Sequence, residues 1–547
     1  MPPATARNWR GDVSGGFRAA IVSIPLALAF GVVSGAGPLP GFWGAVAVGL
    51  MAALFGGTPT QISGPTGPTA LVLAAVLSTY HMSLAEAFTV VMLAGAMQIG
   101  LGVLRLGRYI TLMPYPVISG WASGIGVTII LIQLGPLLGQ PAEAGALDAG
   151  RALRTTLDTV GLHAVLVGSV SLAICLLAPA RLNRLLPAPL LALLVGMALA
   201  ATVFPDVPRL QPAAQLLPHF HFPAIEGARL QDILFAALMI ALLGSIDSLL
   251  GSLAADTATN TWHNSERELV GQGLGNLTAG ILGGIPGAGA TLRTMTNIRA
   301  GGRTRLSGVV HAGILLAAYP LLLAALPHVP LAALAGVLIS IALSIIDWRY
   351  LRLAPRAPRG GLFLMFTVLA LTVFTNLLVA VAIGTILASL SFVKQMADLQ
   401  LESVRTVDNP AGEASLSEEE SALMDRMRGD VLLVQLSGPM SFGAANGLHR
   451  RLGRYQDYSV VILDFTAVPV VDSSAAMSLE QIISRARSGD HTVALVGVSR
   501  SVARVFARLG ILDLIRDCDR HATRLDALRQ AARDLGMEID PAPAHHA

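Results

Sequence analysis

Two glycine- and proline-rich segments decide how this sequence folds: Ser63-Gly-Pro-Thr-Gly-Pro-Thr69 and Gly284-Ile-Pro-Gly-Ala-Gly-Ala-Thr291. A helix that begins at such a segment presents unpaired backbone N–H groups and roughly half a positive charge at its first turn. Two such helix ends that meet would hold a small anion without any basic side chain. One segment alone is better explained by a packing kink, because glycine and proline are common in membrane helices. Two segments at matched positions favour a binding site.

The sequence around these segments is that of a membrane protein. It has 547 residues, of which 53% are hydrophobic and 13% charged, whereas soluble proteins carry about 25% charged residues. A membrane-spanning helix needs about 20 apolar residues. Apolar stretches begin near residues 16, 40, 66, 86, 114, 160, 185, 230, 267, 288, 306, 331, 361 and 377. The two segments fall third in each set of seven stretches, and such matched interruptions indicate a repeated transporter fold with its site at the interruptions.

The arginine distribution predicts the orientation of these spans. Positive charge concentrates in cytoplasmic loops. Arginines follow the even-numbered spans at positions 105, 108, 181, 184, 299, 303, 305, 349, 352, 356 and 359. An even number of spans with both chain ends in the cytoplasm follows from this pattern.

An acidic residue, Asp247, lies inside the apolar run Leu242-Leu-Gly-Ser-Ile-Asp-Ser-Leu-Leu250. A carboxylate in the membrane costs at least about 2.5 kcal/mol, so it is a functional candidate by default. Next to an anion site it is suited to hold a cation or a proton. The alternative is a structural hydrogen bond to a neighbouring helix.

Other charged residues give weaker signals. Arg293 follows the second segment and either attracts anions or simply lies near the cytoplasmic face. The charges of His263, Glu266, Arg267 and Glu268 are interpreted as a solvated loop cluster.

The net charge of +3 and the scattered basic residues argue against a nucleic-acid partner. We identify no nucleophile–base pair, metal cluster or phosphate loop, so an enzyme is not expected.

The character of the chain changes near Lys394. Residues 398–428 are largely polar and are interpreted as a linker. Three apolar runs then predict strands: Val431-Leu-Leu-Val-Gln-Leu436, Val460-Val-Ile-Leu-Asp-Phe465 and Thr492-Val-Ala-Leu-Val-Gly497. Helical stretches between them, at 475–487 and 501–509, indicate a small mixed or parallel sheet covered by helices.

Several motifs together resemble the SulP family of anion transporters (sulfate permease-like). They are Ile24-Pro-Leu-Ala-Leu-Ala-Phe-Gly31, Gly64-Pro-Thr-Gly-Pro-Thr69, Met113-Pro-Tyr-Pro-Val-Ile-Ser-Gly120, Gly244-Ser-Ile-Asp-Ser-Leu249, Arg267-Glu-Leu-Val-Gly-Gln-Gly273 and Pro286-Gly-Ala-Gly-Ala-Thr291. The soluble part resembles a STAS domain, with Val471-Asp-Ser-Ser-Ala475 as its signature loop. Within the family, the chain is most similar to sodium-dependent bicarbonate transporters of the BicA type.

The resemblance implies an α-helical fold of seven plus seven helices in inverted repeat, with core and gate domains, elevator-like movement and a homodimer. The implied anion contacts are Thr69, Ala290 and Thr291, beside Pro68 and Gly289. The implied sodium contacts are Asp247, Gly289, Ala290 and Thr291, with Ser248 beside them. BicA-type proteins have a threonine four residues after the aspartate, where this chain has Gly251. The coupling ion therefore stays open between sodium and a proton.

The STAS signature carries a regulatory expectation. In anti-sigma antagonists the serine that corresponds to Ser473 is phosphorylated, so Asp472 and Ser473 are candidate regulatory residues for a STAS-binding protein. The alternative is that they cap a helix, since aspartate and serine are good N-caps.

These observations predict a transmembrane domain at residues 1–397, with repeats at about 12–205 and 225–397, a linker at 398–428, a cytoplasmic STAS domain at 429–540 and a tail at 541–547. We expect a bacterial inner-membrane symporter that imports bicarbonate or a similar small anion with sodium or a proton and needs no other cofactor. The alternatives are a proton-coupled dicarboxylate or sulfate transporter, an uncoupled channel or exchanger, and a sensor whose STAS domain reports anion occupancy.

Overall fold

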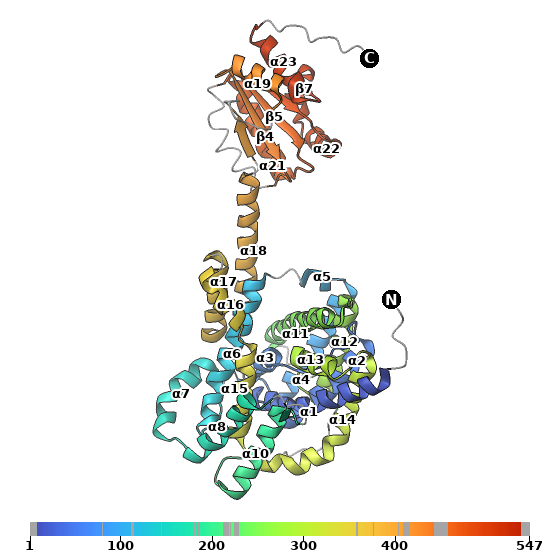
Figure 1. Cartoon of the computed structure of the whole chain (residues 1–547), viewed down its shortest axis with the longest axis vertical. Helices are drawn as coiled ribbons and strands as arrows, with labels where there is room; N and C mark the ends of the chain where they lie inside the picture. The colour runs from blue at the N-terminus through green and yellow to red at the C-terminus, as the bar shows by residue number, and fades with distance from the viewer. Residues whose placement is uncertain are drawn as a thin grey trace. The chain divides into compact units, whose positions relative to one another are not determined.

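The computed structural model describes residues 8–78, 80–110, 114–143, 145–179, 181–182, 186–211, 218, 220–223, 229–356, 359–375, 377–402, 404–407, 416–441 and 458–537. The chain forms two compact units, Met1–Ala388 and Ser389–Ala547. The first unit is helical and the second contains a sheet (Figure 1).

The helices of the first unit occur where the apolar stretches predict them. The first half contains α1 (Trp9–Val33), α2 (Pro38–Phe55), α3 (Gly67–Ser78), α4 (Leu84–Val103), α6 (Tyr115–Leu137), α8 (Leu162–Leu177) and α10 (Ala188–Thr202). The second half contains α11 (Leu230–Thr259), α12 (Ser265–Ile281), α13 (Thr291–Arg299), α14 (Arg305–Ala325), α15 (Leu331–Ile345), α17 (Arg359–Phe374) and α18 (Leu377–Glu402). All but the first begin within three residues of the predicted positions.

Length and hydropathy are consistent with a multi-pass membrane protein. Among the described residues, six helices are long and apolar enough to cross a membrane, or seven if the bent pair Leu331–Ile345 and Trp348–Arg356 is one span. Several apolar helices are shorter, including α3, α8, α10 and α17. The short helices α5 (Gly107–Ile110), α7 (Ala146–Asp158) and α16 (Trp348–Leu353) lie in connections.

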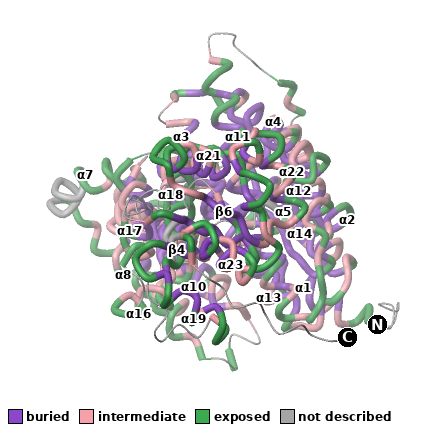
Figure 2. The backbone as a smooth tube through the Cα atoms, turned by 90° about the horizontal axis from the view of Figure 1, so that it is seen from above, coloured by how far each residue is buried: buried purple, intermediate pink, exposed green. Residues whose placement is uncertain are grey.

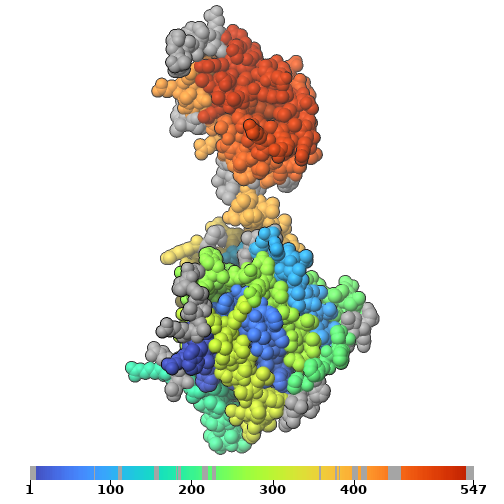
Figure 3. Space-filling model, turned by 90° about the vertical axis from the view of Figure 1, so that its right-hand side faces the viewer, coloured from blue at the N-terminus to red at the C-terminus, as the bar shows by residue number. Residues whose placement is uncertain are grey.

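Packing between the halves reproduces the repeat. Helix α1 packs on α14, and its counterpart α11 packs on α4. Likewise α2 packs on α14 as α12 packs on α4, and α8 packs on α15 as α17 packs on α6. Each of these helix–helix contacts has an equivalent contact in which each helix is replaced by its counterpart from the other half, as a two-fold repeat requires. On one face of this unit, blue residues of the N-terminal part lie beside yellow-green residues from the region of α14 (Figure 3).

Small residues allow the central helices to approach closely, as is common in membrane proteins. Much of α1 is buried (purple in Figure 2), and so are many residues of α11 and α12. At Gly95 of α4, an added Cβ would lie 2.4 Å from the Leu277 nitrogen and 2.6 Å from the Gly273 carbonyl oxygen of α12. These are backbone atoms, so the two helices would have to separate.

The second unit has a five-stranded sheet in the order β3-β4-β5-β6-β7. The strands are β3 (Val404–Val407), β4 (Val431–Ser437), β5 (Val460–Ala467), β6 (Thr492–Val496) and β7 (Arg520–His521). β3 is antiparallel to β4, and the remaining pairs are parallel. The three predicted strands and the mixed sheet are therefore present. Helices α21 (Ser473–Ser488), α22 (Arg500–Arg508) and α23 (Arg524–Asp534) accompany the strands.

The polar stretch 398–428 is more ordered than the linker interpretation supposes. It contains the end of α18, the edge strand β3 and helix α19 (Glu418–Arg426). Leu423, Met424 and Val407 belong to one hydrophobic core of the second unit. Sparse apolar side chains thus anchor a segment whose overall composition is polar. Residues 403 and 408–415 lie outside the described residues.

We predict that Gly95→Ala lowers the thermal stability of the protein in detergent, because overpacking typically costs about 1–3 kcal/mol. The midpoint of heat-induced loss of the monodisperse peak in size-exclusion chromatography would measure it. Gly100→Ala on the same helix is the control, since an added Cβ there meets nothing within 4 Å. Equal midpoints for the two variants would contradict the close approach of α4 and α12.

Candidate functional site

The two glycine- and proline-rich segments meet in a short antiparallel ladder. β1 (Ser63–Pro65) pairs with β2 (Gly287–Gly289), with Ser63 opposite Gly289. Helix α3 follows β1, and α13 follows β2. Because the strands are antiparallel, the chain leaves the ladder in opposite directions, and each helix starts at one of its ends. A ladder of three residue pairs is roughly 10 Å long, so the two positive helix ends start near opposite ends of this short ladder.

Backbone donors at the second helix start lack side-chain caps. The N-cap residue Ala290 cannot cap α13 with its methyl group, and α13 has no side-chain cap. The Ala290 N–H donates to the Ile62 carbonyl at 3.0 Å, and the Gly289 N–H donates to Ser248 Oγ at 2.9 Å. The ladder is therefore fixed by hydrogen bonds, while the first turn of α13 has no side-chain cap, an arrangement that suits an anion site.

The two predicted threonines differ in their surroundings. Thr69 is fully buried, and its hydroxyl lies 3.1 Å from the carbonyl oxygens of both Thr66 and Pro286. A hydroxyl has one hydrogen, so this donor is engaged with a carbonyl and joins α3 to the segment before β2. Thr291 at the start of α13 is exposed, and Ala290 is half-buried. Pro68 is buried in the first turn of α3.

Two opposite charges lie beside the ladder. Asp247 on α11 is half-buried, hydrogen-bonds with Thr66 and interacts electrostatically with Arg293. Arg293 on α13 is fully buried, and its Nη2 donates to the Pro65 carbonyl at 2.7 Å. Its Nε and Nη1 have no hydrogen-bond partner among the described residues. A buried cation at this place favours the first of the two interpretations of Arg293, attraction of anions.

A polar stripe on α12, which the sequence analysis missed, holds the ladder. Its members are Glu268, Gln272 and Asn276, four residues apart on one helix face. Gln272 Nε2 donates to Ser63 Oγ at 2.6 Å on the β1 side. On the β2 side, the Asn276 side chain donates to the Gly287 carbonyl at 3.0 Å and accepts from its N–H at 2.8 Å. The spacing of four was visible in the sequence and could have revealed the stripe.

The sequence analysis interprets Glu268 as part of a solvated charge cluster, and the structure shows that this is wrong for Glu268. Its side chain is 1% exposed, not solvated. Its carboxylate accepts hydrogen bonds from the Gly57 and Thr58 N–H groups at 2.9 and 2.8 Å, and from Gln61 Nε2 at 3.0 Å. The loop between α2 and β1 wraps around this carboxylate, which explains how a charge is kept inside the helical unit.

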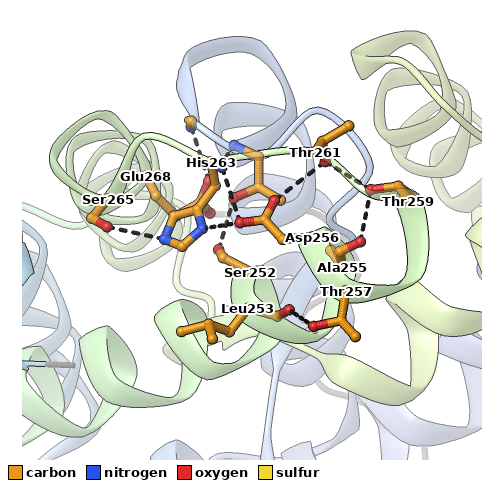
Figure 4. A network of polar contacts seen from close by, with 12 residues as sticks. Ser252, Leu253, Ala255, Asp256, Thr257, Thr259, Thr261, His263, Ser265 and Glu268 are labelled. Atoms are coloured by element: carbon orange, nitrogen blue, oxygen red, sulfur yellow. Dashed lines mark hydrogen bonds and ion pairs between the residues drawn. The ribbon is translucent and has the colours of Figure 1, made fainter. Parts of the chain in front are cut away.

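His263 is also bonded rather than merely solvated. Its Nδ1 lies 2.6 Å from Asp256 Oδ2, and its Nε2 lies 2.9 Å from Ser265 Oγ (Figure 4). The same Asp256 oxygen accepts the backbone N–H of His263 at 3.0 Å. Although the order of the three side chains is that of a hydrolytic triad, this backbone bond shows that they close the turn between α11 and α12. We therefore assign the cluster a structural role.

The regulatory candidates lie in the second unit. Asp472 is the N-cap of α21, and its carboxylate accepts the Ala475 N–H at 2.7 Å. Ser473 is the first residue of that helix and is exposed. The capping interpretation thus holds for Asp472, and Ser473 is accessible.

The fold and the site together define a class: a multi-pass membrane transporter built from two repeats, with a small soluble domain. Residues 9–368 match the sulfate permease family, and residues 422–526 match the STAS domain. The chain belongs to the sulfate permease family, as its sequence predicts, and its relatives are transporters rather than enzymes.

Individual relatives cover nearly the whole chain. It is 41% identical to the bicarbonate transporter BicA of Picosynechococcus sp., over 96% of this chain and 95% of the relative. A putative sulfate transporter of Bacillus subtilis, YvdB, is 30% identical over 93% of this chain and 95% of its own length.

Solved structures agree with this fold. The transmembrane domain of a cyanobacterial BicA matches with a TM-score of 0.65 and 43% identity, covering 69% of this chain and 98% of that one. Murine Slc26a9, in an inward-facing state, matches with a TM-score of 0.80 at 16% identity, covering 97% of this chain and 93% of that one. At such low identity the second match shows the fold alone.

We predict that Asn276→Leu weakens anion binding and lowers thermal stability, because it leaves the Gly287 N–H and carbonyl unpaired at about 1–3 kcal/mol for each buried group. Anion-dependent shifts of the melting temperature would measure both effects. Thr278→Ala on the same helix is the control, since that hydroxyl bonds only within α12, to the Leu274 carbonyl. Unchanged anion binding in Asn276→Leu would argue against the ladder as the site.

Proposed function

We propose that this protein imports bicarbonate or a similar small anion together with a cation, by symport. The observation that carries the proposal is the ladder between two helix N-termini, with a carboxylate and a guanidinium beside it. The 41% identity to a bicarbonate transporter over nearly the whole chain supports this anion.

The charges around the ladder favour cotransport of a cation. Asp247 and Arg293 have opposite charges, and the Glu268 carboxylate lies in the same buried network, so an added monoanion brings one more uncompensated negative charge into a low-dielectric site. A sodium ion or a proton would cancel it. The membrane potential adds to this argument, because an interior negative by about 100 mV opposes monoanion entry by roughly 2.3 kcal/mol.

The proposed binding residues are those around the ladder. Backbone N–H groups of the first turns of α3 and α13 would hold the anion, with contacts from Thr69, Pro68, Gly289, Ala290 and Thr291. Asp247, Gly289, Ala290 and Thr291 would surround the cation, with Ser248 beside them. The engaged hydroxyl of Thr69 suggests that this residue acts by shaping the site.

The remaining expectations complete the proposal. The helical unit would act as an elevator within a homodimer in the bacterial inner membrane, and the STAS domain would lie in the cytoplasm. The domains would divide as the sequence analysis predicts, with Asp472 and Ser473 at the surface offered to a regulatory partner.

One observation supports a second candidate, a proton-coupled transporter of sulfate or a dicarboxylate. Gly251 stands where BicA-type proteins have a threonine, so one hydroxyl is missing near the proposed cation site. The 30% identity to a putative sulfate transporter is consistent with this alternative.

Uptake of radiolabelled bicarbonate into proteoliposomes tests the function. We expect an inward sodium gradient to stimulate uptake, and Asp247→Asn to reduce the stimulated rate at least tenfold, equivalent to about 1.4 kcal/mol. Asp232→Asn is the matched control, because it makes the same change at an exposed position on the same helix.

Sulfate and fumarate under a proton gradient distinguish the candidates. Proton-driven uptake of either, without a bicarbonate signal, would overturn bicarbonate symport in favour of the second candidate. Flux that is unchanged in Asp247→Asn would indicate an uncoupled pathway.

A further inference from the structure

Gly251 has no side chain, and two oxygen atoms face the place where a side chain at this residue would begin. A Cβ added there would lie 3.3 Å from the Gly289 carbonyl oxygen and 3.4 Å from Gln61 Oε1. Asp247 lies one helical turn earlier on the same face of α11, and positions four apart have Cβ atoms roughly 5–6 Å from each other. A backbone carbonyl and an amide oxygen, from two different elements, therefore face Gly251, and Asp247 lies on the same face of the helix that carries Gly251.

The orientation of the Gln61 amide is fixed by its neighbours. Its Nε2 donates to Glu268 Oε1 at 3.0 Å, and an ionised carboxylate only accepts hydrogen bonds. The amide oxygen must therefore face the other way, toward α11, where Ser252 Oγ donates to it at 2.9 Å. Gln61 is 3% exposed, so water does not compete for these contacts.

Glu268 is in turn held rigidly. In addition to Gln61 and two backbone N–H groups, Gln272 Nε2 donates to its Oε1 at 2.8 Å. Gln272 also bonds β1 through Ser63. The carboxylate thus connects the α2–β1 loop, the ladder and α12, and it sets the direction in which Gln61 points.

We propose that the Gln61 amide oxygen is a direct ligand of the coupling cation, which occupies the space beside Gly251 between Asp247 and the Gly289 carbonyl. Glu268 is the positioning residue that aims the amide oxygen at this space. The inference rests on the proposed symport and specifies its ion. Hard cations are held by several oxygen ligands at once, so this oxygen set suits sodium as the coupling ion.

Sodium binding can be measured without transport. The melting temperature of the purified full-length protein in nanodiscs would be followed as sodium replaces choline at constant ionic strength, since a ligand of the folded state raises it. We expect a saturable rise in the unsubstituted protein and a sodium Kd raised at least tenfold in Gln61→Leu, within the range of about 10- to 100-fold known for metal-site variants. Gln133→Leu is the matched control, a buried glutamine on α6 away from the ladder.

Two further variants separate ligation from folding. Glu268→Gln keeps the shape of the side chain but offers a donor as well as an acceptor to Gln61, so we expect it to weaken sodium binding. Gly251→Thr in the Gln61→Leu background supplies a hydroxyl at the same place, and we expect it to restore sodium binding.

The possible results of the sodium-binding and transport experiments bear on different parts of the proposal. A sodium response that persists in Gln61→Leu with unchanged affinity, or a double variant no better than Gln61→Leu, would overturn the role of Gln61. No sodium response in a protein that still transports bicarbonate would overturn the cation site and leave the anion function standing. Absence of bicarbonate transport, with sodium binding intact, would instead contradict the proposed function.

Discussion

Inside a membrane, every backbone N–H and carbonyl group must find a partner within the protein, and the structure of this site follows from that constraint. Interrupting a helix to expose its N-terminus frees several such groups. Here two interrupted segments satisfy each other through the β1–β2 ladder, and the polar stripe of α12 bonds the atoms that remain.

This arrangement also explains why buried charge is tolerated beside the ladder. Glu268 is surrounded by donors, and Arg293 donates to a ladder carbonyl while it interacts with Asp247. Burying one charged side chain alone costs folding free energy, but a network in which every charged group has hydrogen-bond partners is tolerated. The network makes the geometry of the anion and cation positions interdependent, because the residues that fix the ladder also orient Gln61.

Much of the fold could be predicted from the sequence, because apolar length and matched glycine–proline segments are strong local signals. The helix starts and the three central strands were found in this way. The pairing of β1 with β2 was expected only as a meeting of helix ends, since nothing local specifies a strand of three residues.

Glu268 was misjudged because its neighbours in the chain are polar and exposed, whereas its partners come from a distant loop. Gln61 gave no signal for a similar reason: its role depends on the absence of a side chain at Gly251. The strand at 404–407 and the helix at 418–426 were hidden by a polar composition that a few apolar anchors override.

The Thr69 hydroxyl and its acceptor, the Pro286 carbonyl, are 217 residues apart in the chain. At a synthesis rate of about 5–20 residues per second, roughly 10 to 45 s pass between their appearances on the ribosome. During that time the first half carries an unpaired strand and a helix start whose backbone groups lack partners in lipid. The nascent first half must therefore be sheltered by the insertion machinery or remain partly outside the bilayer until the second half arrives. Membrane insertion of this protein thus depends on the delay between synthesis of its two halves as well as on the hydrophobicity of its helices.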